Sequence, residues 1–206
     1  MDGRMLETER LLLRRFTSDD APALLAMMSD DEVMRFLPWF THTCVADTAS
    51  YLDEQYLTWY RVADAGERGA GGLPLDLRFA VCLRQADGGA DELIGFIKIS
   101  SESDTLDLGY AFCRKAWGHG YATEAVRALI AEARREGFPF LTATHDESNP
   151  ASGRVMERCG MTYRYAYRER WQPKDFDVVF KMYQIDLAAG VETYRGYWER
   201  YPEHWV

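Results

Sequence analysis

Large apolar side chains alternate with small or polar ones along the middle of the chain and then change to a helical spacing. They stand at every second position from Leu106 to Phe112, which is the period of a β-strand. Gly118 and Gly120 interrupt the pattern, as expected of a turn. From Ala122 to Ala133 the apolar positions recur three and four residues apart. The pattern predicts a strand, a glycine-containing turn and a helix that begins directly after the turn.

Apolar runs predict further strands on both sides of this unit. They are Leu11 to Phe16, Leu77 to Leu83, Leu93 to Ile99, Phe138 to Ala143, Tyr163 to Glu169 and Val178 to Ile185. The sequence Ala86-Asp87-Gly88-Gly89 predicts a hairpin between two of them. Because a helix connects the strands at 106–112 and 138–143, these two are expected to be parallel. The fold class is α/β (α+β), with a mixed, mostly antiparallel sheet and flanking helices.

Three helices are predicted between the first two strands. Thr17 or Ser18 can cap the first helix, and a short second one follows at residues 33–37. The third runs from Ala46 to Tyr60 and is expected to place Ala49, Leu52, Tyr56 and Trp59 on one face. Residues 63–74, rich in glycine and charge, are predicted to form a loop.

The turn at Gly118 and Gly120 has the properties of an anion site. The first N–H groups of a helix have no partner inside it, and the helix dipole adds partial positive charge there. Glycines let a phosphate or pyrophosphate approach the backbone closely. The Walker and three-glycine dinucleotide spacings are absent, so a plain chain reversal is the alternative interpretation.

A second stretch, Asn149 to Met161, follows the predicted strand at 138–143. Asn149 is a good helix N-cap, and Pro150 suits the first helical position. Gly160 suits the position just past a helix. This stretch predicts a strand end, a capped helix and a glycine stop.

Together the two stretches resemble the GNAT superfamily of acetyl-CoA-dependent N-acetyltransferases. The branch most similar to this sequence contains the ribosomal-protein N-terminal acetyltransferases. The similarity rests on Trp117-Gly118-His119-Gly120-Tyr121-Ala122-Thr123-Glu124-Ala125, on Asn149 to Met161, and on Glu7-Thr8-Glu9-Arg10-Leu11-Leu12-Leu13-Arg14. There are departures: Trp117 stands where other branches have Gln or Arg, and Met156 stands where many members have a tyrosine general acid.

The resemblance implies a GNAT fold in which strands four and five splay apart to admit the pantetheine arm of acetyl-CoA, the co-substrate. N–H groups at about Tyr110 to Cys113 would hold the thioester carbonyl and its oxyanion, and those of Gly118 to Thr123 the pyrophosphate. The implied cofactor-binding residues are Phe112, Cys113, Trp117, Gly118, His119, Gly120, Tyr121, Ala122, Thr123, Asn149 and Ser152. Asn149 could instead serve only as a helix cap.

The resemblance also implies direct attack of a primary amine on the thioester. Because Met156 cannot donate a proton, Ser152 is the first candidate acid, although a plain helix-surface serine is also possible. Tyr110 could position the amine or a water. The candidates for the general base are Asp107, His145, Asp146 and Glu147. The predicted catalytic residues are Ser152, Tyr110 and His145.

The acceptor has no recognisable sequence code. Trp39 and Phe40 could line its site, or they could form a small aromatic cluster that closes the core. A protein N-terminus and a small amine such as a polyamine or aminoglycoside are the alternatives. A non-catalytic acyl-CoA-binding module is the rival to an enzyme.

Composition narrows these alternatives. A net charge of −9 argues against nucleic-acid binding and is compatible with a cationic acceptor. No apolar run approaches the ~20 residues of a membrane helix, and the start of the chain lacks the form of a signal peptide, so a cytoplasmic location is expected. Four scattered cysteines without a Cys-x-x-Cys pair predict no metal site.

The length suits one catalytic domain, residues 1–187, followed by an aromatic tail, residues 188–206. The tail contains Tyr194, Tyr197, Trp198, Tyr201 and Trp205. So many aromatic side chains are expected to be covered. They would pack on the domain or on a partner, for which a homodimer is one possibility.

Overall fold

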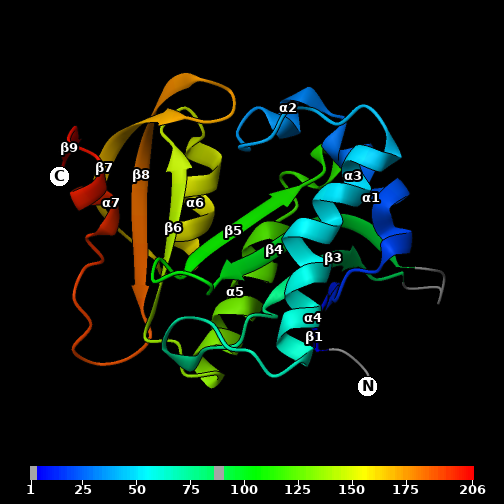
Figure 1. The fold of residues 1–206 in the computed structure, drawn as a ribbon, viewed down its shortest axis with the longest axis horizontal. Coiled ribbons are helices and arrows are strands. Elements are labelled where there is room, and N and C mark those ends of the chain that lie inside the picture. Colours follow the sequence, from blue (N-terminus) through cyan, green and yellow to red (C-terminus); the bar gives the residue numbers. More distant parts are fainter. Residues whose placement is uncertain (1–3, 86–90) are drawn as a thin grey trace.

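A single β-sheet runs through the computed structural model, which describes residues 4–85 and 91–206 (Figure 1). Within these residues the strand order is β1-β2-β3-β4-β5-β6-β8-β7-β9. The strands are β1 (Met5–Glu7), β2 (Leu11–Arg14), β3 (Arg78–Leu83), β4 (Glu92–Ser100), β5 (Asp107–Phe112), β6 (Phe140–Asp146), β7 (Thr162–Trp171), β8 (Phe176–Asp186) and β9 (His204–Trp205). Neighbouring strands are antiparallel except β5 and β6, which are parallel.

The helices connect and flank this sheet. The α-helices are α1 (Ala21–Met28), α2 (Asp31–Met34), α3 (Val45–Leu52), α4 (Thr58–Asp64), α5 (Tyr121–Arg135), α6 (Pro150–Arg158) and α7 (Gly196–Arg200). Short turns of other helix types are η1 (Ser18–Asp20), η2 (Asp53–Leu57), η3 (Ala70–Gly72) and η4 (Arg114–Ala116). Among the residues described, no helix has the length and apolarity needed to cross a membrane.

The predicted mixed α/β class and all seven predicted strands are confirmed; β1 and β9 were not predicted. The antiparallel pairing of β3 with β4 agrees with the predicted hairpin, whose turn at 86–89 lies outside the described residues. β1 and β9 are only three and two residues long. Such short segments carry too little alternation to be recognised.

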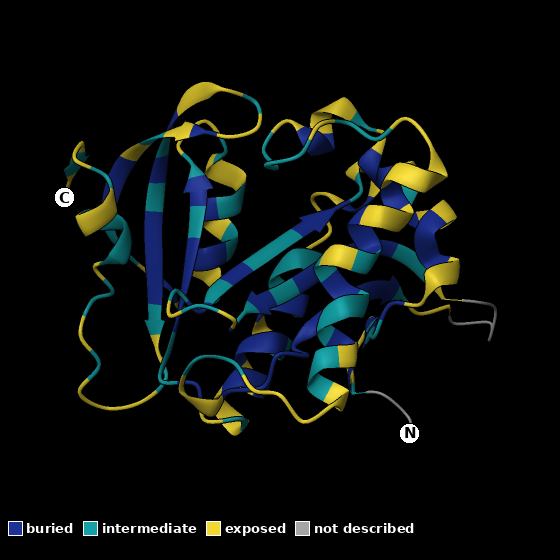
Figure 2. Ribbon diagram, in the orientation of Figure 1, coloured by how far each residue is buried: buried dark blue, intermediate teal, exposed yellow. Residues whose placement is uncertain are grey.

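The sheet separates two apolar clusters. Helices α5 and α6 cover one face through residues such as Val126, Leu129 and Met156. Helices α1 to α4 cover part of the other face, where Leu24 and Tyr56 pack near β3, β4 and β5. Figure 2 shows burial concentrated along the sheet and on the helix sides turned toward it. The two faces of the sheet are therefore covered by different helices.

The predicted apolar face of the helix at 46–60 is wrong in part. Ala49 is exposed and Trp59 is only half-buried, whereas Tyr51 and Tyr60 are buried. The buried positions Thr48, Leu52, Tyr56 and Tyr60 recur every four residues through the π-helical turn η2, which has more residues per turn than an α-helix. At both ends the buried face therefore lies one residue away from the predicted one.

The C-terminal segment packs on the outer strands of the sheet. β9 pairs with β7, and α7 lies over the same region (Figure 1). The ring of Tyr167 on β7 stacks on Tyr197 at 5.1 Å and on Tyr201 at 4.8 Å between ring centroids. This segment covers an aromatic cluster on β7 and β8.

Candidate active site

The parallel strands β5 and β6 part soon after they meet. Their one paired position joins Asp107 to Thr142, and the Thr142 N–H donates to the Leu106 carbonyl at 3.3 Å. Beyond it, β5 continues along β4 and β6 continues along β8, so that the two strands diverge (Figure 1). The expected splay between the fourth and fifth predicted strands is confirmed.

The splay leaves backbone groups of β5 facing an open edge. The Cys113 N–H donates to the Ile94 carbonyl of β4 at 2.8 Å. Successive N–H groups of a strand point to opposite edges, so those of Tyr110 and Phe112 point toward the gap beside β6. The sequence predicted a ligand-binding edge at Tyr110 to Cys113, and within it these two N–H groups are the ones that can bind a ligand. We call them the open edge of β5.

The glycine loop continues from this edge into α5. Gly118 and Gly120 have φ values of 78° and 81°, in a backbone region that residues other than glycine rarely adopt. In the described part of the chain, the N–H groups of residues 118–123 make no backbone hydrogen bond. A helix N-terminus with free N–H groups can hold a phosphate. The loop therefore has the geometry of the expected pyrophosphate cradle.

Side chains of the loop fix its shape. The Trp117 indole N–H donates to the Phe112 carbonyl at 2.8 Å, and the ring remains 47% exposed. The His119 imidazole lies 2.8 Å from the Trp117 carbonyl through Nδ1 and stacks on Tyr121. Binding of a cofactor by these three side chains stays a prediction. Their observed contacts explain why aromatic rings occur here.

A clamp from the start of the chain supports the loop, and the sequence reasoning missed it. Glu124 accepts hydrogen bonds from the Thr8 hydroxyl at 2.6 Å and from the Arg10 backbone N–H at 2.9 Å. The Arg10 guanidinium also pairs with Glu124 and donates to the His119 carbonyl at 3.0 Å. Burial alone would raise the pKa of Glu124, but the bonds from Thr8 and Arg10 lower it. The acidic residue at a helix start was the available signal, but its partners lie more than a hundred residues away.

Helix α6 brings two of the predicted catalytic residues together. Its N-cap Asn149 accepts a hydrogen bond from the Ser152 N–H at 3.4 Å. The Tyr110 hydroxyl lies 3.0 Å from both the hydroxyl and the carbonyl oxygen of Ser152. Burial raises the pKa of Tyr110, with partial compensation from Ser152. The phenol is therefore a neutral hydrogen-bonding group.

His145 lies under the same helix. Its Nδ1 is 2.7 Å from the Asp146 carbonyl oxygen, and its Nε2 has no partner among the described residues. Nε2 faces Gly153, where a Cβ atom would stand only 2.6 Å away. Burial lowers the pKa of the imidazole, which favours its neutral form. A catalytic role for His145 stays a prediction, and the structure places the ring in packed surroundings.

The opposite face of the sheet carries two half-buried charged residues, Asp107 on β5 and Lys98 on β4. Asp107 shares its face with Ala111, which belongs to the cluster beneath α1 to α4. Burial raises the pKa of Asp107 to about 6, and burial lowers the pKa of Lys98 to about 8. The Asp107 Oδ1 atom has no hydrogen-bond partner in the described part of the chain. The Lys98 ammonium donates to Gln55 at 2.8 Å.

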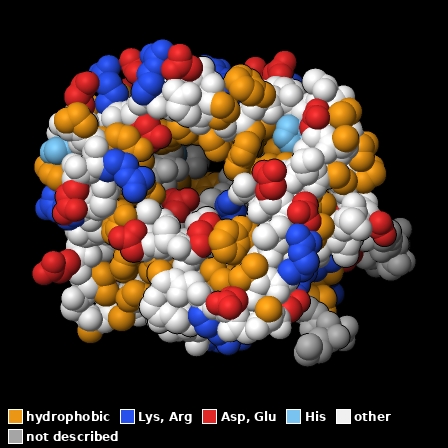
Figure 3. Space-filling model, in the orientation of Figure 1, with side chains coloured by type: hydrophobic (Ala, Val, Ile, Leu, Met, Phe, Trp, Pro, Cys, Tyr) orange, Lys and Arg blue, Asp and Glu red, His pale blue; other side chains and the backbone are white. Residues whose placement is uncertain are grey.

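This face is hollowed between its two coverings. Figure 3 shows the depression between the side formed by α1 to α4 and the side formed by the C-terminal segment. Burial raises the pKa of the Tyr197 phenol in that segment, and the nearby Asp107 carboxylate raises it further. The Asp107 carboxylate also adds to the raised pKa of Tyr167, although burial and then the Tyr197 phenol contribute more. A lysine within an otherwise apolar strand was the sequence signal for this polar site.

The predicted acceptor residues Trp39 and Phe40 follow α2. Trp39 packs edge-to-face on Tyr51 with ring centroids 4.8 Å apart, and Phe40 is 63% exposed. A cavity of about 400 Å³ near the ends of β6 and α2 includes Asp146 and Glu147 but neither aromatic residue. An acceptor role for Trp39 and Phe40 stays a prediction.

The glycine cradle at the start of α5, next to a parallel pair that splays, is the α/β arrangement that the resemblance to the GNAT superfamily implies. The family described as "Acetyltransferase (GNAT) domain" matches residues 10–162. The chain belongs to this family of acetyltransferases, whose acetyl donor is acetyl-CoA.

Known proteins agree with this assignment. The uncharacterized N-acetyltransferase p20 of Bacillus licheniformis is 30% identical over 128 residues, which cover 61% of this chain and 63% of p20. A GNAT-family acetyltransferase from Bacillus anthracis superimposes with a TM-score of 0.71 at 24% identity, covering 89% of this chain and 99% of the other. RimL, a ribosomal L7/L12 alpha-N-protein acetyltransferase solved with coenzyme A, gives a TM-score of 0.67 at 15% identity, with coverage of 89% and 98%.

Proposed function

We propose that this enzyme transfers the acetyl group of acetyl-CoA directly to a primary amine. The observation that supports this best is the open edge of β5 next to the free N–H groups of residues 118–123. The pyrophosphate would bind the glycine loop, and the pantetheine arm would extend along the gap like an added strand. The two sites lie one after the other on a continuous segment of chain.

The thioester carbonyl would accept a hydrogen bond from the open edge, at the N–H of Phe112 or Tyr110. The same N–H would stabilise the oxyanion when the amine adds to the carbonyl carbon. Much of the acceleration would come from alignment of the two reactants. Collapse of the intermediate releases the CoA thiolate, which the Tyr110–Ser152 hydroxyl pair could protonate.

Asp107 is the base that we infer among the four sequence candidates. It lies on the face opposite Tyr110, so the acceptor and the CoA thiol would approach the thioester from different sides. A carboxyl with a pKa of about 6 is ionised at neutral pH and can accept a proton from the bound ammonium, directly or through water, so that the neutral amine attacks the thioester. His145 lies under α6, on the CoA side of the sheet.

The acceptor enters through the hollow in Figure 3. The Asp107 carboxylate and the nearby Tyr197 phenol suit a cationic amine. We infer a peptide N-terminus as the first acceptor class, with small amines as the alternative. RimL, with the same fold, modifies the N-terminus of a ribosomal protein.

The test is release of free CoA from acetyl-CoA across a panel of amines. The panel contains N-terminal peptides of ribosomal proteins, polyamines, aminoglycosides and free amino acids. Turnover with peptides alone supports a protein N-terminus as the acceptor. Turnover with one small amine alone would assign that amine as the acceptor instead. No turnover, together with no increase in melting temperature on adding acetyl-CoA, would contradict the proposed use of the loop.

A further inference from the structure

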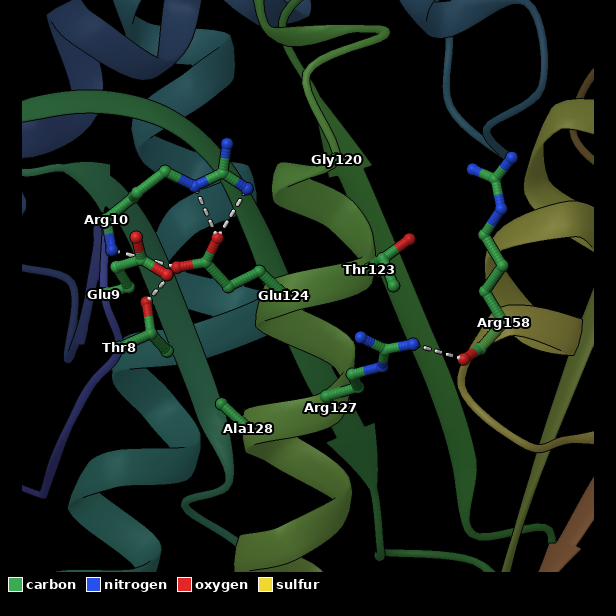
Figure 4. Close-up of a pocket in the computed structure, with 9 residues that line it drawn as sticks. All are labelled: Thr8, Glu9, Arg10, Gly120, Thr123, Glu124, Arg127, Ala128 and Arg158. Carbon is green, nitrogen blue, oxygen red and sulfur yellow. Dashed lines mark hydrogen bonds and ion pairs between the residues drawn. The ribbon is translucent and has the colours of Figure 1, made fainter.

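A cavity of about 670 Å³ lies beside the glycine loop, on the outer side of α5. Three separate segments line it: the turn between β1 and β2, the first two turns of α5, and the end of α6 (Figure 4). Gly120 and Thr123 belong both to this lining and to the pyrophosphate cradle. The cavity is therefore contiguous with the proposed cofactor site.

Arginines dominate the charged groups of the lining. They are Arg10, Arg127 and Arg158, against the carboxylates of Glu9 and Glu124. Arg10 and Glu124 pair with each other through contacts of 2.6 and 2.7 Å, so they leave little net charge. Among the remaining charged residues of the lining, two arginines stand against one exposed carboxylate, Glu9, in a protein whose net charge is −9.

Arg127 and Arg158 have no carboxylate partner within the described residues. The Arg127 guanidinium donates one hydrogen bond at 2.8 Å to the backbone carbonyl of Arg158, which ties α5 to the end of α6 (Figure 4). That bond uses one of its five donors. A guanidinium anchored in this way keeps most of its donors free for an anion.

The position of this pair matches the chemistry of the cofactor. Arg127 lies one helical turn, roughly 6 Å, beyond Thr123. Coenzyme A carries a phosphomonoester on the ribose 3′ oxygen, a few bonds from the pyrophosphate. Such a group bears close to two negative charges at neutral pH and offers three acceptor oxygens, which arginine can bind in a bidentate manner.

We propose that Arg127 and Arg158 bind the 3′-phosphate of coenzyme A, an assignment that rests on the proposed use of the glycine loop for the pyrophosphate. The pair then distinguishes coenzyme A from nucleotides that lack this phosphate. Arg10 keeps a supporting role, because its guanidinium is occupied by Glu124 and by the His119 carbonyl.

The experiment compares coenzyme A with 3′-dephospho-coenzyme A by calorimetry, using the full chain. The wild type is expected to bind coenzyme A at least about tenfold more tightly, as for a few charge-assisted hydrogen bonds at an exposed site. Arg127→Ala and Arg158→Ala should each weaken coenzyme A severalfold and leave dephospho-coenzyme A nearly unchanged. The double variant should bind both ligands equally.

Arg134→Ala is the matched control. Arg134 is an exposed residue on the same helix, seven residues beyond Arg127 and outside the cavity lining. It should keep the full preference for coenzyme A, although the net charge changes equally. Equal binding of both ligands by the wild type would overturn the assignment while leaving the pyrophosphate site intact, and so would a full preference in the double variant. Binding of neither ligand would overturn the proposed function and this inference together.

Discussion

The hydroxyl of Tyr110 on β5 lies 3.0 Å from the hydroxyl of Ser152 on α6. Forty-two residues separate them in the chain, and the splay of β5 and β6 leaves the pair beside the open edge. No aromatic hydroxyl is available at position 156, where a buried methionine stands. This pair is the proton donor that we propose for the departing thiolate.

Ser152→Ala and Tyr110→Phe should each lower kcat by roughly 10²-fold, with little change in the affinity for acetyl-CoA. The double variant should be hardly slower than either single one, because the hydroxyls act as one unit. Steady-state CoA release and calorimetry give the two quantities. Ser148→Ala, an exposed serine before the same helix, is the control and should keep full activity. Three variants with normal kcat would exclude the pair as the proton donor.

Asp107→Asn should lower kcat/KM by roughly 10²- to 10⁴-fold at pH 7.5. The basic form is the carboxylate, so the wild-type rate should fall as the pH decreases through about 6, and the variant should lack this limb. A pH profile of kcat/KM measures both effects. Asp104→Asn, an exposed neighbour, should leave the profile unchanged. An acid limb that persists in the Asp107 variant would assign the base elsewhere.

The same substitution should stabilise the protein above pH 6. A carboxyl whose folded pKa is raised contributes its full stability only below its unfolded pKa of about 4, and it loses that contribution as the pH rises from there through about 6. The amide cannot ionise, so the free energy of unfolding at pH 8 should increase by about 1–2 kcal/mol. Urea unfolding of the wild type and the variant at pH 3.5 and pH 8 measures it. The gain should be nearly absent at pH 3.5, below the unfolded pKa of the carboxyl, and an equal gain at both pH values would contradict the buried charge.

Gly120→Glu should abolish CoA binding by placing a carboxylate in the cradle. Any side chain at this φ of 81° adds strain, so Gly120→Ala is the necessary comparison. Both variants should lose about 1–2 kcal/mol of stability, since each carries the same backbone cost. Only the glutamate should reduce CoA affinity by more than about tenfold beyond the alanine, by charge repulsion. Equal affinities by calorimetry would show that no phosphate lies near residue 120.

Asn149 can be tested for a role beyond capping. Asn149→Ala should lower stability by about 1 kcal/mol, because the Ser152 N–H loses its side-chain acceptor and keeps only the backbone carbonyl of residue 149. Asn149→Asp keeps a capping oxygen and should restore the stability. If the amide also contacts the pantetheine, the aspartate variant should still bind acetyl-CoA several times more weakly. Wild-type affinity in that variant would limit Asn149 to the cap.

Much of the fold was predictable because its signals are local. Alternation identified the strands, including β5 with its neighbouring glycine turn, and N-cap and proline positions identified α6. Short edge strands were missed because two or three residues carry no period. The face of the helix at 46–60 was assigned wrongly at its two ends because its buried positions recur every four residues through a π-turn, which leaves no mark in the composition.

The sequence by itself determined the free N–H groups of the glycine loop, where we propose that the cofactor binds. Free N–H groups at a helix start depend only on the glycine turn and the helix that follows, so adjacent residues suffice to build them. The tertiary structure decided everything that joins distant segments: the clamp of Arg10 on Glu124, the Tyr110–Ser152 pair, the burial of Asp107, and the arginines at 127 and 158. These depend on how strands and helices pack, because a pKa shift or a shared cavity arises from neighbours in space that the chain order does not reveal.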